Sequence, residues 1–175
     1  MNIPKDFNIV DSLNVEFENG LGVKLPITRP KFRAWKGECV FDYGGKPLLD
    51  YNGEACFAEL LIARLLIDNG LNAVWVETYG GIHYLRSMPK DWKLKTEHIS
   101  IPQDKEDFLK KIWKQAKTTA CFDVLAWNDE NIILLEAKHL KKDNLTKPQI
   151  KFIKGAIDCG VDCEKLLIVE WDFEK

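Results

Sequence analysis

The sequence predicts an α/β fold in which a mixed β-sheet is covered by helices. From residue 53 onward, the hydrophobic patterns follow the order helix, strand, insertion, hairpin, helix, strand. Residues 132–135 form an uninterrupted apolar run, which is typical of a strand covered on both faces. Residues 1–50 instead contain short apolar segments separated by turn residues. We therefore expect a β-rich N-terminal extension followed by an α/β core.

The N-terminal extension is expected to contain a β-hairpin. The segments 15–18 and 21–25 flank Asn19-Gly20, and Asn-Gly is the strongest short signal for a tight hairpin turn. Proline and glycine residues interrupt the rest of the extension. This pattern predicts further short strands and turns up to residue 50.

The core is expected to begin with a helix over residues 53–68. Asn52 is a suitable N-cap, and Asn69-Gly70 is a suitable stop because glycine readily adopts the left-handed conformation at a helix C-terminus. The segment 73–78 then predicts a strand. The remaining expected elements are an insertion that is irregular over 80–103, a helix over 104–117, strands over 121–127 and 132–138, a helix from Thr146 to Gly160, and a strand over 165–171.

Length and composition indicate one ordinary globular domain. A chain of 175 residues suits a single domain, and 46% apolar with 30% charged residues excludes a disordered tail or a fibrous repeat. Its 25 basic and 27 acidic residues give a net charge of −2. That balance excludes a generally basic surface for nucleic acid, although it permits a local basic face.

The cysteines point to a reducing compartment. There are five, and although Cys159 and Cys163 have the spacing of half a zinc site, no second pair or nearby histidine completes one. We expect reduced thiols and a cytoplasmic protein. The first residues lack the basic and apolar regions of a signal peptide, and no apolar run approaches the roughly 18 residues of a membrane span.

One charged residue falls on the inner face of the first core helix. At about 100° per residue, Glu59 shares a face with Ile62 and Leu66 and so points toward the sheet. A buried carboxylate is costly unless it is paired, neutralised or bound to a cation. Glu59 therefore belongs either to an ion pair or loop cap in the core, or to a cation-binding site.

Two further carboxylates are expected to face each other on the hairpin of strands 121–127 and 132–138. If its turn is symmetric about Asp129 and Glu130, Asp123 lies directly across from Glu136. Lys138 lies two residues further along the same face. Opposed carboxylates repel, so the pair calls for a cation, and magnesium or manganese suits such oxygen ligands. The alternative is a solvated hairpin face with an ordinary Glu–Lys pair.

These residues carry a resemblance to a known superfamily. Asp123 in Phe122–Trp127, followed by Glu136-Ala137-Lys138, resembles the Asp…Glu-x-Lys signature of the PD-(D/E)xK nucleases. Glu59 is similar to an acidic residue that many members carry on the preceding helix, and Gln149 is similar to a glutamine found on the following helix in several branches. The nearest likeness is to the virus-type replication-repair nucleases (VRR-NUC) and the archaeal Holliday-junction resolvases.

The resemblance covers residues 53–78 and 121–171 and implies the restriction-endonuclease-like fold for this core. Residues 1–50, the β-rich N-terminal extension, and 80–118, the insertion with its helix, have no counterpart in the family. We expect these two segments of the single domain to determine substrate choice.

The resemblance also implies roles for the candidate residues. Asp123 and Glu136 would bind Mg²⁺ or Mn²⁺ together with the Ala137 carbonyl, and Glu59 would complete the site directly or through water. Lys138 would orient or help to deprotonate the attacking water. Gln149 has two interpretations, a residue of this active site or only the capping-box partner of Thr146.

Substrate contact is expected from basic side chains near the site, namely Lys141, Lys142, Lys147 and Lys151. Basic residues also surround Phe32 and Trp35 over residues 29–36, although such clusters often only solvate a surface. The expected activity is metal-dependent hydrolysis of nucleic acid, with DNA as the expected substrate and branched or flapped structures as candidates. The alternatives are a catalytically silent binding module and an RNase or toxin-type nuclease. A homodimer and an association with replication, repair or restriction proteins are both open.

Overall fold

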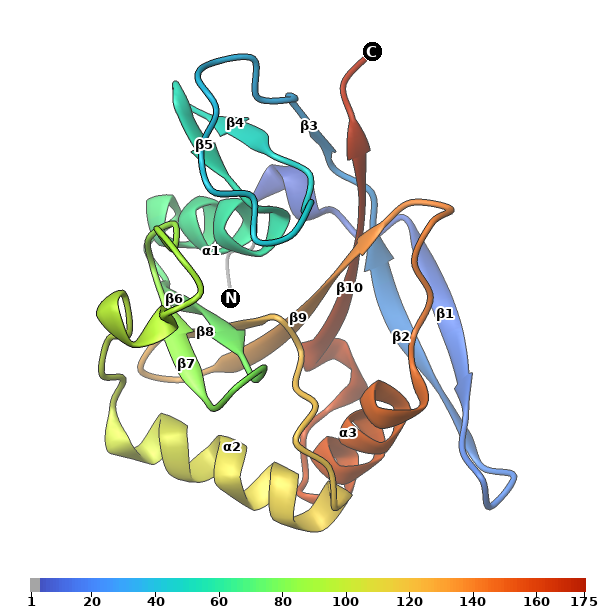
Figure 1. Cartoon of the computed structure of the whole chain (residues 1–175). Helices are drawn as coiled ribbons and strands as arrows, with labels where there is room; N and C mark the ends of the chain where they lie inside the picture. Colours follow the sequence, from blue (N-terminus) through green and yellow to red (C-terminus); the bar gives the residue numbers. More distant parts are fainter. Residues whose placement is uncertain (1–3) are drawn as a thin grey trace.

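The centre of the molecule is an eight-stranded mixed β-sheet with strand order β1-β2-β10-β9-β8-β6-β7, in which β3 also pairs with β10 (Figure 1). The computed structural model describes residues 4–175, so the first three residues of the predicted N-terminal extension lie outside it. The strands of this sheet are β1 (Asp11–Glu16), β2 (Gly22–Thr28), β3 (Lys31–Phe32), β6 (Asn72–Glu77), β7 (His83–Leu85), β8 (Val124–Trp127), β9 (Ile132–His139) and β10 (Leu166–Phe173).

Helices cover both faces of this sheet (Figure 1). Helix α1 (Ala58–Asp68) packs on one face through buried side chains such as Leu60 and Ile62. Helices α2 (Gln103–Ala116) and α3 (Lys147–Asp158) pack on the other face through Leu109, Ile112 and Phe152. The predicted α/β class with a mixed sheet is therefore confirmed. Within residues 4–175, no helix has both the length and the apolar character needed to cross a bilayer.

The N-terminal hairpin forms at the predicted place but belongs to the central sheet. Strands β1 and β2 pair antiparallel, with Glu16 opposite Gly22, and Gly20 occupies the turn with φ +77°. Strand β2 then pairs parallel with β10, where Ile27 lies beside Ile168. The first part of the N-terminal extension therefore adds two strands, β1 and β2, at one edge of the core sheet.

The predicted start of the first core helix is wrong. Helix α1 begins at Ala58, because the preceding residues form a small hairpin of β4 (Leu49–Tyr51) and β5 (Glu54–Cys56). Asn52 and Gly53 are its two-residue turn, with φ of +53° and +87°, and Asn52 caps no helix. Asn-Gly suits a type I′ turn, in which both central residues need positive φ. The predicted stop at Asn69-Gly70 is confirmed, with Gly70 at φ +84°.

The segment 80–103 is less irregular than predicted. Strand β7 adds an edge to the sheet by pairing with β6, with Trp75 opposite Leu85, and a 3₁₀ turn, η2, covers Leu94–Thr96. Two further 3₁₀ turns, η1 and η3, cover Lys5–Phe7 and Cys163–Lys165.

The predicted helix over 104–117 is confirmed as α2, which crosses α3 closely. A Cβ at Gly155 would meet the Cβ of Ala116 at 2.5 Å, so this crossing needs glycine.

Candidate active site

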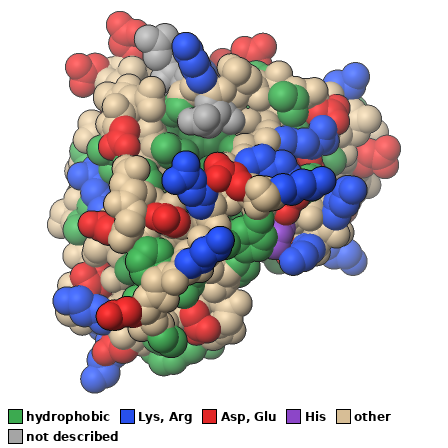
Figure 2. Space-filling view, turned by 90° about the horizontal axis from the view of Figure 1, so that it is seen from above, with side chains coloured by type: hydrophobic (Ala, Val, Ile, Leu, Met, Phe, Trp, Pro, Cys, Tyr) green, Lys and Arg blue, Asp and Glu red, His purple; other side chains and the backbone are tan. Residues whose placement is uncertain are grey.

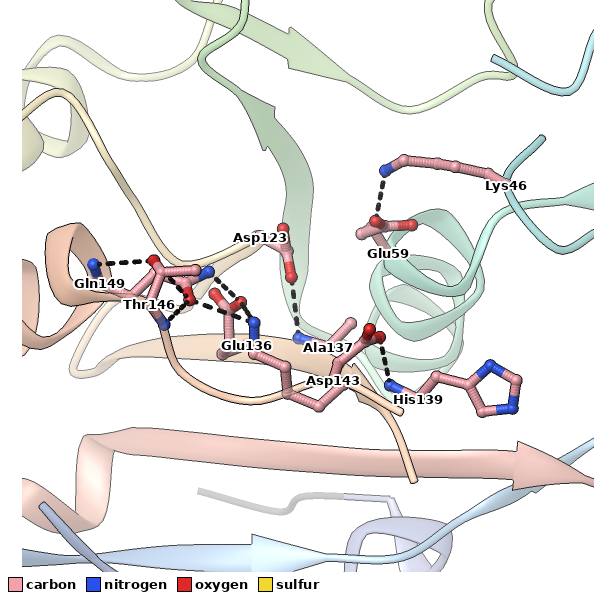
Figure 3. Close-up of polar contacts among 10 residues, drawn as sticks. Lys46, Glu59, Asp123, Glu136, Ala137, His139, Asp143, Thr146 and Gln149 are labelled. Atoms are coloured by element: carbon pink, nitrogen blue, oxygen red, sulfur yellow. Dashed lines mark hydrogen bonds and ion pairs between the residues drawn. The ribbon is translucent and has the colours of Figure 1, made fainter. Parts of the chain in front are cut away.

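The candidate site lies where β8 and β9 meet the N-terminal ends of α1 and α3 (Figure 3). The two strands pair antiparallel with Val124 opposite Leu135. This is the predicted register, and it brings Asp123, which directly precedes β8, opposite Glu136. Helix α1 contributes Glu59 from its first turn, and α3 contributes Gln149.

Asp123 is held on both sides by backbone hydrogen bonds. Its Oδ2 accepts a hydrogen bond from the Ala137 N–H at 2.9 Å, and its carbonyl oxygen accepts one from the Val76 N–H at 2.7 Å. Burial raises the pKa of the Asp123 carboxyl well above its usual range, and the charges of Glu136 and Glu59 raise it further. The three carboxylates therefore repel one another across the site.

Glu136 is the most deeply buried of the candidate residues, with 1% of its side chain exposed. Its Oε1 accepts hydrogen bonds from Lys138 Nζ at 2.9 Å and from Gln149 Nε2 at 2.5 Å. Its Oε2 is buried and has no hydrogen-bond partner within residues 4–175. Burial raises the pKa of Glu136 to about 7, although Lys138 opposes this shift. A buried carboxylate oxygen without a partner calls for an explanation, and a bound ion or water is one.

Gln149 closes the capping box of its own helix and also contacts two other candidate residues, Glu136 and Lys138. It closes the capping box of α3, because Thr146 Oγ1 accepts from the Gln149 N–H and Gln149 Oε1 accepts from the Thr146 N–H at 2.9 Å. The same Oε1 also accepts from Lys138 Nζ at 3.1 Å, while Nε2 donates to Glu136. The helix cap therefore fixes a side chain that holds both Glu136 and Lys138.

Glu59 is paired with a residue that sequence reasoning missed. Its Oε1 lies 2.5 Å from Nζ of Lys46, which comes from the loop before β4 (Figure 3). The Glu59 side chain is 13% exposed. This is the core ion pair that the sequence left open. The inward face of α1 showed that Glu59 needs a cation, but nothing in the sequence pointed to Lys46.

The Lys46 ammonium lies close to three aromatic rings as well as to the Glu59 carboxylate. It lies 4.8 Å from the ring centroid of Trp75 and 5.7 Å from those of Tyr43 and Phe57. Burial lowers the pKa of Lys46, but Glu59, with Asp123 and Glu77 behind it, outweighs burial and leaves that pKa raised. Lys46 therefore stays charged and partly neutralises the acidic site.

The residues present fit a hard divalent cation in chemistry but do not form a complete cage. Among the residues that the structure describes, no three Asp, Glu, His or Cys side chains lie together as a ready ligand set. Magnesium is usually held by one or two carboxylates, with waters and substrate phosphates as its other ligands. Asp123 and the unpartnered oxygen of Glu136 match that donor set, whereas they do not match the closed cage of a structural zinc.

A cavity of about 290 Å³ adjoins Glu59 and Ala137, and Lys142 also lines it. Ala137 therefore both donates its N–H to Asp123 and lines this cavity. His139, the next residue of β9 after Lys138, also lines this cavity, and its ring stacks on Trp171 at 4.2 Å between centroids. His139 is buried and takes part in packing.

The four predicted nucleic-acid contacts fall into two groups. Lys141 and Lys142 are exposed in the turn after β9, where Lys141 has φ +63°, and Lys142 lines the cavity beside Glu59. Lys147 and Lys151 instead line a second cavity, between α3 and the β1–β2 hairpin. Of these four lysines, Lys142 lines the cavity beside the candidate site.

The basic cluster near Phe32 is largely neutralised. Strand β3 runs parallel to β10, and Arg29, Lys31 and Arg33 each pair with an acidic residue of or next to β10. The contacts are Arg29–Glu170 at 2.8 Å, Lys31–Asp172 at 2.8 Å and Arg33–Glu174 at 3.2 Å. Figure 2 shows Lys and Arg side chains gathered toward one side of the face it views, with acidic side chains among them.

Comparisons with protein-family models, curated proteins and solved structures return no match for this chain.

Proposed function

We propose that this protein is a magnesium- or manganese-dependent nuclease with a restriction-endonuclease-like core, which hydrolyses phosphodiester bonds in DNA. One observation carries the proposal: the buried Glu136 Oε2 has no partner and lies in a site with a second carboxylate, Asp123, and the ammonium of Lys138. A structural ion pair would satisfy both oxygens of a buried carboxylate. The Asp…Glu-x-Lys resemblance supports the same conclusion.

Asp123, Glu136 and the Ala137 carbonyl would hold the metal ion, with Glu59 directly or through water. The chemistry that magnesium supplies when bound is acidification of a water ligand and neutralisation of charge on the phosphate. The raised pKa values of Asp123 and Glu136 are consistent with a pair that a divalent cation stabilises in its ionised form.

The residues of the chain would act on the water and the developing charge. Gln149 holds Lys138 at 3.1 Å and Glu136 at 2.5 Å, which fixes the ammonium beside the carboxylate. From this position, Lys138 would orient the attacking water and stabilise negative charge on the pentacoordinate phosphate. The water gives up a proton to solvent as its oxygen bonds to phosphorus, the bond from phosphorus to one sugar oxygen breaks, and that oxygen takes up a proton from solvent as it leaves.

A silent nucleic-acid-binding or protein-binding module is the second candidate, and one feature favours it. Each carboxylate already has a partner inside the protein: Lys46 pairs with Glu59, Lys138 and Gln149 hold Glu136, and the Ala137 N–H holds Asp123. A nuclease must exchange or share these contacts when metal binds. A silent module would keep them.

A cleavage assay separates the two candidates. Labelled single-stranded, duplex, flapped and branched DNA, with matching RNA, is incubated with the protein in magnesium, in manganese and in EDTA. We expect cleavage that requires metal and is lost in Glu136→Gln and in Lys138→Ala, with binding retained in Lys138→Ala. Glu130→Gln, an exposed carboxylate in the turn of the same hairpin, is the matched control. Binding without cleavage in either metal would favour the silent module, and cleavage of RNA alone would favour the RNase alternative.

A further inference from the structure

Three aromatic side chains form a cluster beside the candidate site, which we call the aromatic platform: Trp92, which is exposed, and Phe41 and Tyr43, which are half-buried. The Tyr43 and Trp92 rings lie 4.8 Å apart at an interplanar angle of 35°, and the edge of Phe41 approaches Trp92 at 5.4 Å. Trp92 is 60% exposed. Such a large exposed ring adds little to the core, so its position needs another explanation.

The aromatic platform continues directly into the candidate site. Tyr43 contacts the buried Trp75 edge-on at 6.0 Å, and both rings flank the Lys46 ammonium that pairs with Glu59. A base stacked on Trp92 would therefore lie one aromatic ring away from the Lys46–Glu59 pair. The platform brings residues 41–43 together with Trp92, which precedes η2. These residues belong to the N-terminal extension and to the insertion, the two parts of the chain without a counterpart in the nuclease family.

Positive charge without an ion-pair partner within residues 4–175 lies close to Trp92 in the sequence. Lys90, Lys93 and Lys95 flank Trp92 in the sequence, all three are exposed, and none forms an ion pair with another residue in 4–175. The acidic neighbours Asp42 and Asp91 are engaged in turns, where their carboxylates accept the N–H groups of Gly44 and Lys93. By contrast, the basic residues of 29–33 are matched by acidic partners on the β10 side.

We infer that the aromatic platform stacks unpaired bases of a nucleic acid strand, so that the substrate class is single-stranded nucleic acid or a duplex with an unpaired tail. This inference rests on the proposed function, which it deepens. Aromatic rings stack on bases of any sequence, and adjacent lysines neutralise the phosphates. In a fully paired duplex the base faces are stacked on one another, so the platform has nothing to bind.

The test measures binding apart from cleavage. Fluorescence anisotropy in EDTA reports the affinity for a labelled single strand, for a blunt duplex and for the same duplex with an unpaired tail, each as DNA and as RNA. We expect Trp92→Ala to weaken binding to the single strand and the tailed duplex by roughly 5- to 150-fold, the range that stacking on one ring provides. Affinity for the blunt duplex should not change.

Three further variants make the result specific. Trp92→Phe keeps a ring against Gly44 and should restore most of the affinity, which a purely structural role of the indole would not predict. Ile67→Ala, at the far end of α1 from Glu59, controls for loss of an exposed apolar side chain. Replacing Lys90, Lys93 and Lys95 by glutamine should reduce the salt slope for the single strand by about two. Thermal melting confirms that each variant is folded.

The outcomes distinguish this inference from the proposed function. An equal loss on single strand and blunt duplex, no loss in Trp92→Ala, or no binding of any strand by the wild type would overturn the inference. Selective loss of single-strand binding in Trp92→Ala, in a protein that cleaves nothing in either metal, would keep the inference and overturn the nuclease. Metal-dependent cleavage with unchanged affinity in Trp92→Ala would support the nuclease and overturn the inference.

Discussion

The Lys46 ammonium lies 2.5 Å from the Glu59 carboxylate, on the side of the site opposite to Gln149 (Figure 3). Asp123, whose carboxylate lies between the two helix ends, is affected by both charges: Glu59 raises its pKa and Lys46 lowers it. The Lys46 ammonium therefore neutralises part of the negative charge that, from the sequence, a metal ion was expected to neutralise. Binding of a divalent cation and the Lys46–Glu59 pair are expected to compete.

Replacing Lys46 should separate stability from metal affinity. Lys46→Met removes the cation and leaves a mostly buried Glu59 without a partner, so the free energy of unfolding in EDTA should fall by about 1–3 kcal/mol. The same change should lower the Kd for magnesium, because the ion no longer competes with an ammonium. Urea unfolding in EDTA and calorimetric titration with magnesium measure the two effects. Lys154→Met, which breaks the more exposed pair with Asp158, is the control and should cost less than about 1 kcal/mol. Weaker magnesium binding in Lys46→Met would contradict the competition.

Asp123→Asn should abolish the response to metal at little cost in stability. The Asn oxygen can still accept the hydrogen bond from the Ala137 N–H, while the repulsion with Glu136 and Glu59 is relieved. We expect metal-free stability to be unchanged or higher, and magnesium to raise the melting temperature of the wild type but not of this variant. Thermal melting with EDTA and with magnesium checks both. A marked loss of metal-free stability would instead identify Asp123 as part of a structural ion pair.

The raised pKa of Glu136 predicts that metal-free stability falls as the pH rises from about 5 to 7.5. The folded protein holds the proton up to about pH 7, whereas the unfolded chain releases it near the ordinary pKa of 4.5. The bound proton therefore stabilises the folded protein fully below pH 4.5. This stabilisation, about 3 kcal/mol in total, is lost as the pH rises through 7. Asp123 shifts in the same direction.

Urea unfolding in EDTA across this pH range measures the effect. Glu136→Gln should flatten the profile, because glutamine does not titrate, and Glu130→Gln should leave it unchanged. Saturating magnesium should remove most of the fall in the wild type, since it stabilises the ionised pair. A stability that rises between pH 5 and 7.5 would contradict the assignment.

Lys141 and Lys142 should contribute to binding rather than to chemistry. The double variant Lys141→Ala with Lys142→Ala should weaken nucleic-acid binding and reduce the slope of log affinity against log salt by about two, if each lysine contacts one phosphate. The control is Lys31→Ala with Arg33→Ala, whose charges are already matched by Asp172 and Glu174. Titrations at several salt concentrations, with single-turnover cleavage alongside, test this. An unchanged slope would remove both lysines from the substrate path.

The sequence by itself determined the features that depend on neighbours in the chain. Side-chain alternation and a short symmetric turn placed Asp123 opposite Glu136, with Lys138 on the same face. Thr146 and Gln149 define the start of α3 through a capping box that spans three residues. Each of these depends on local backbone geometry, so the residue pattern was sufficient to predict it.

Only the tertiary structure decided which distant charges meet. The partner of Glu59 comes from a loop 13 residues away, and Arg29, Lys31 and Arg33 are neutralised across 141 residues because β3 happens to run beside β10. Asn52 was predicted to start a helix, but the pairing of β4 with β5 places Asn52 and Gly53 in a hairpin turn. Partner choice of this kind depends on how strands and loops pack over the whole chain, and a pattern of nearby residues contains no information about that packing.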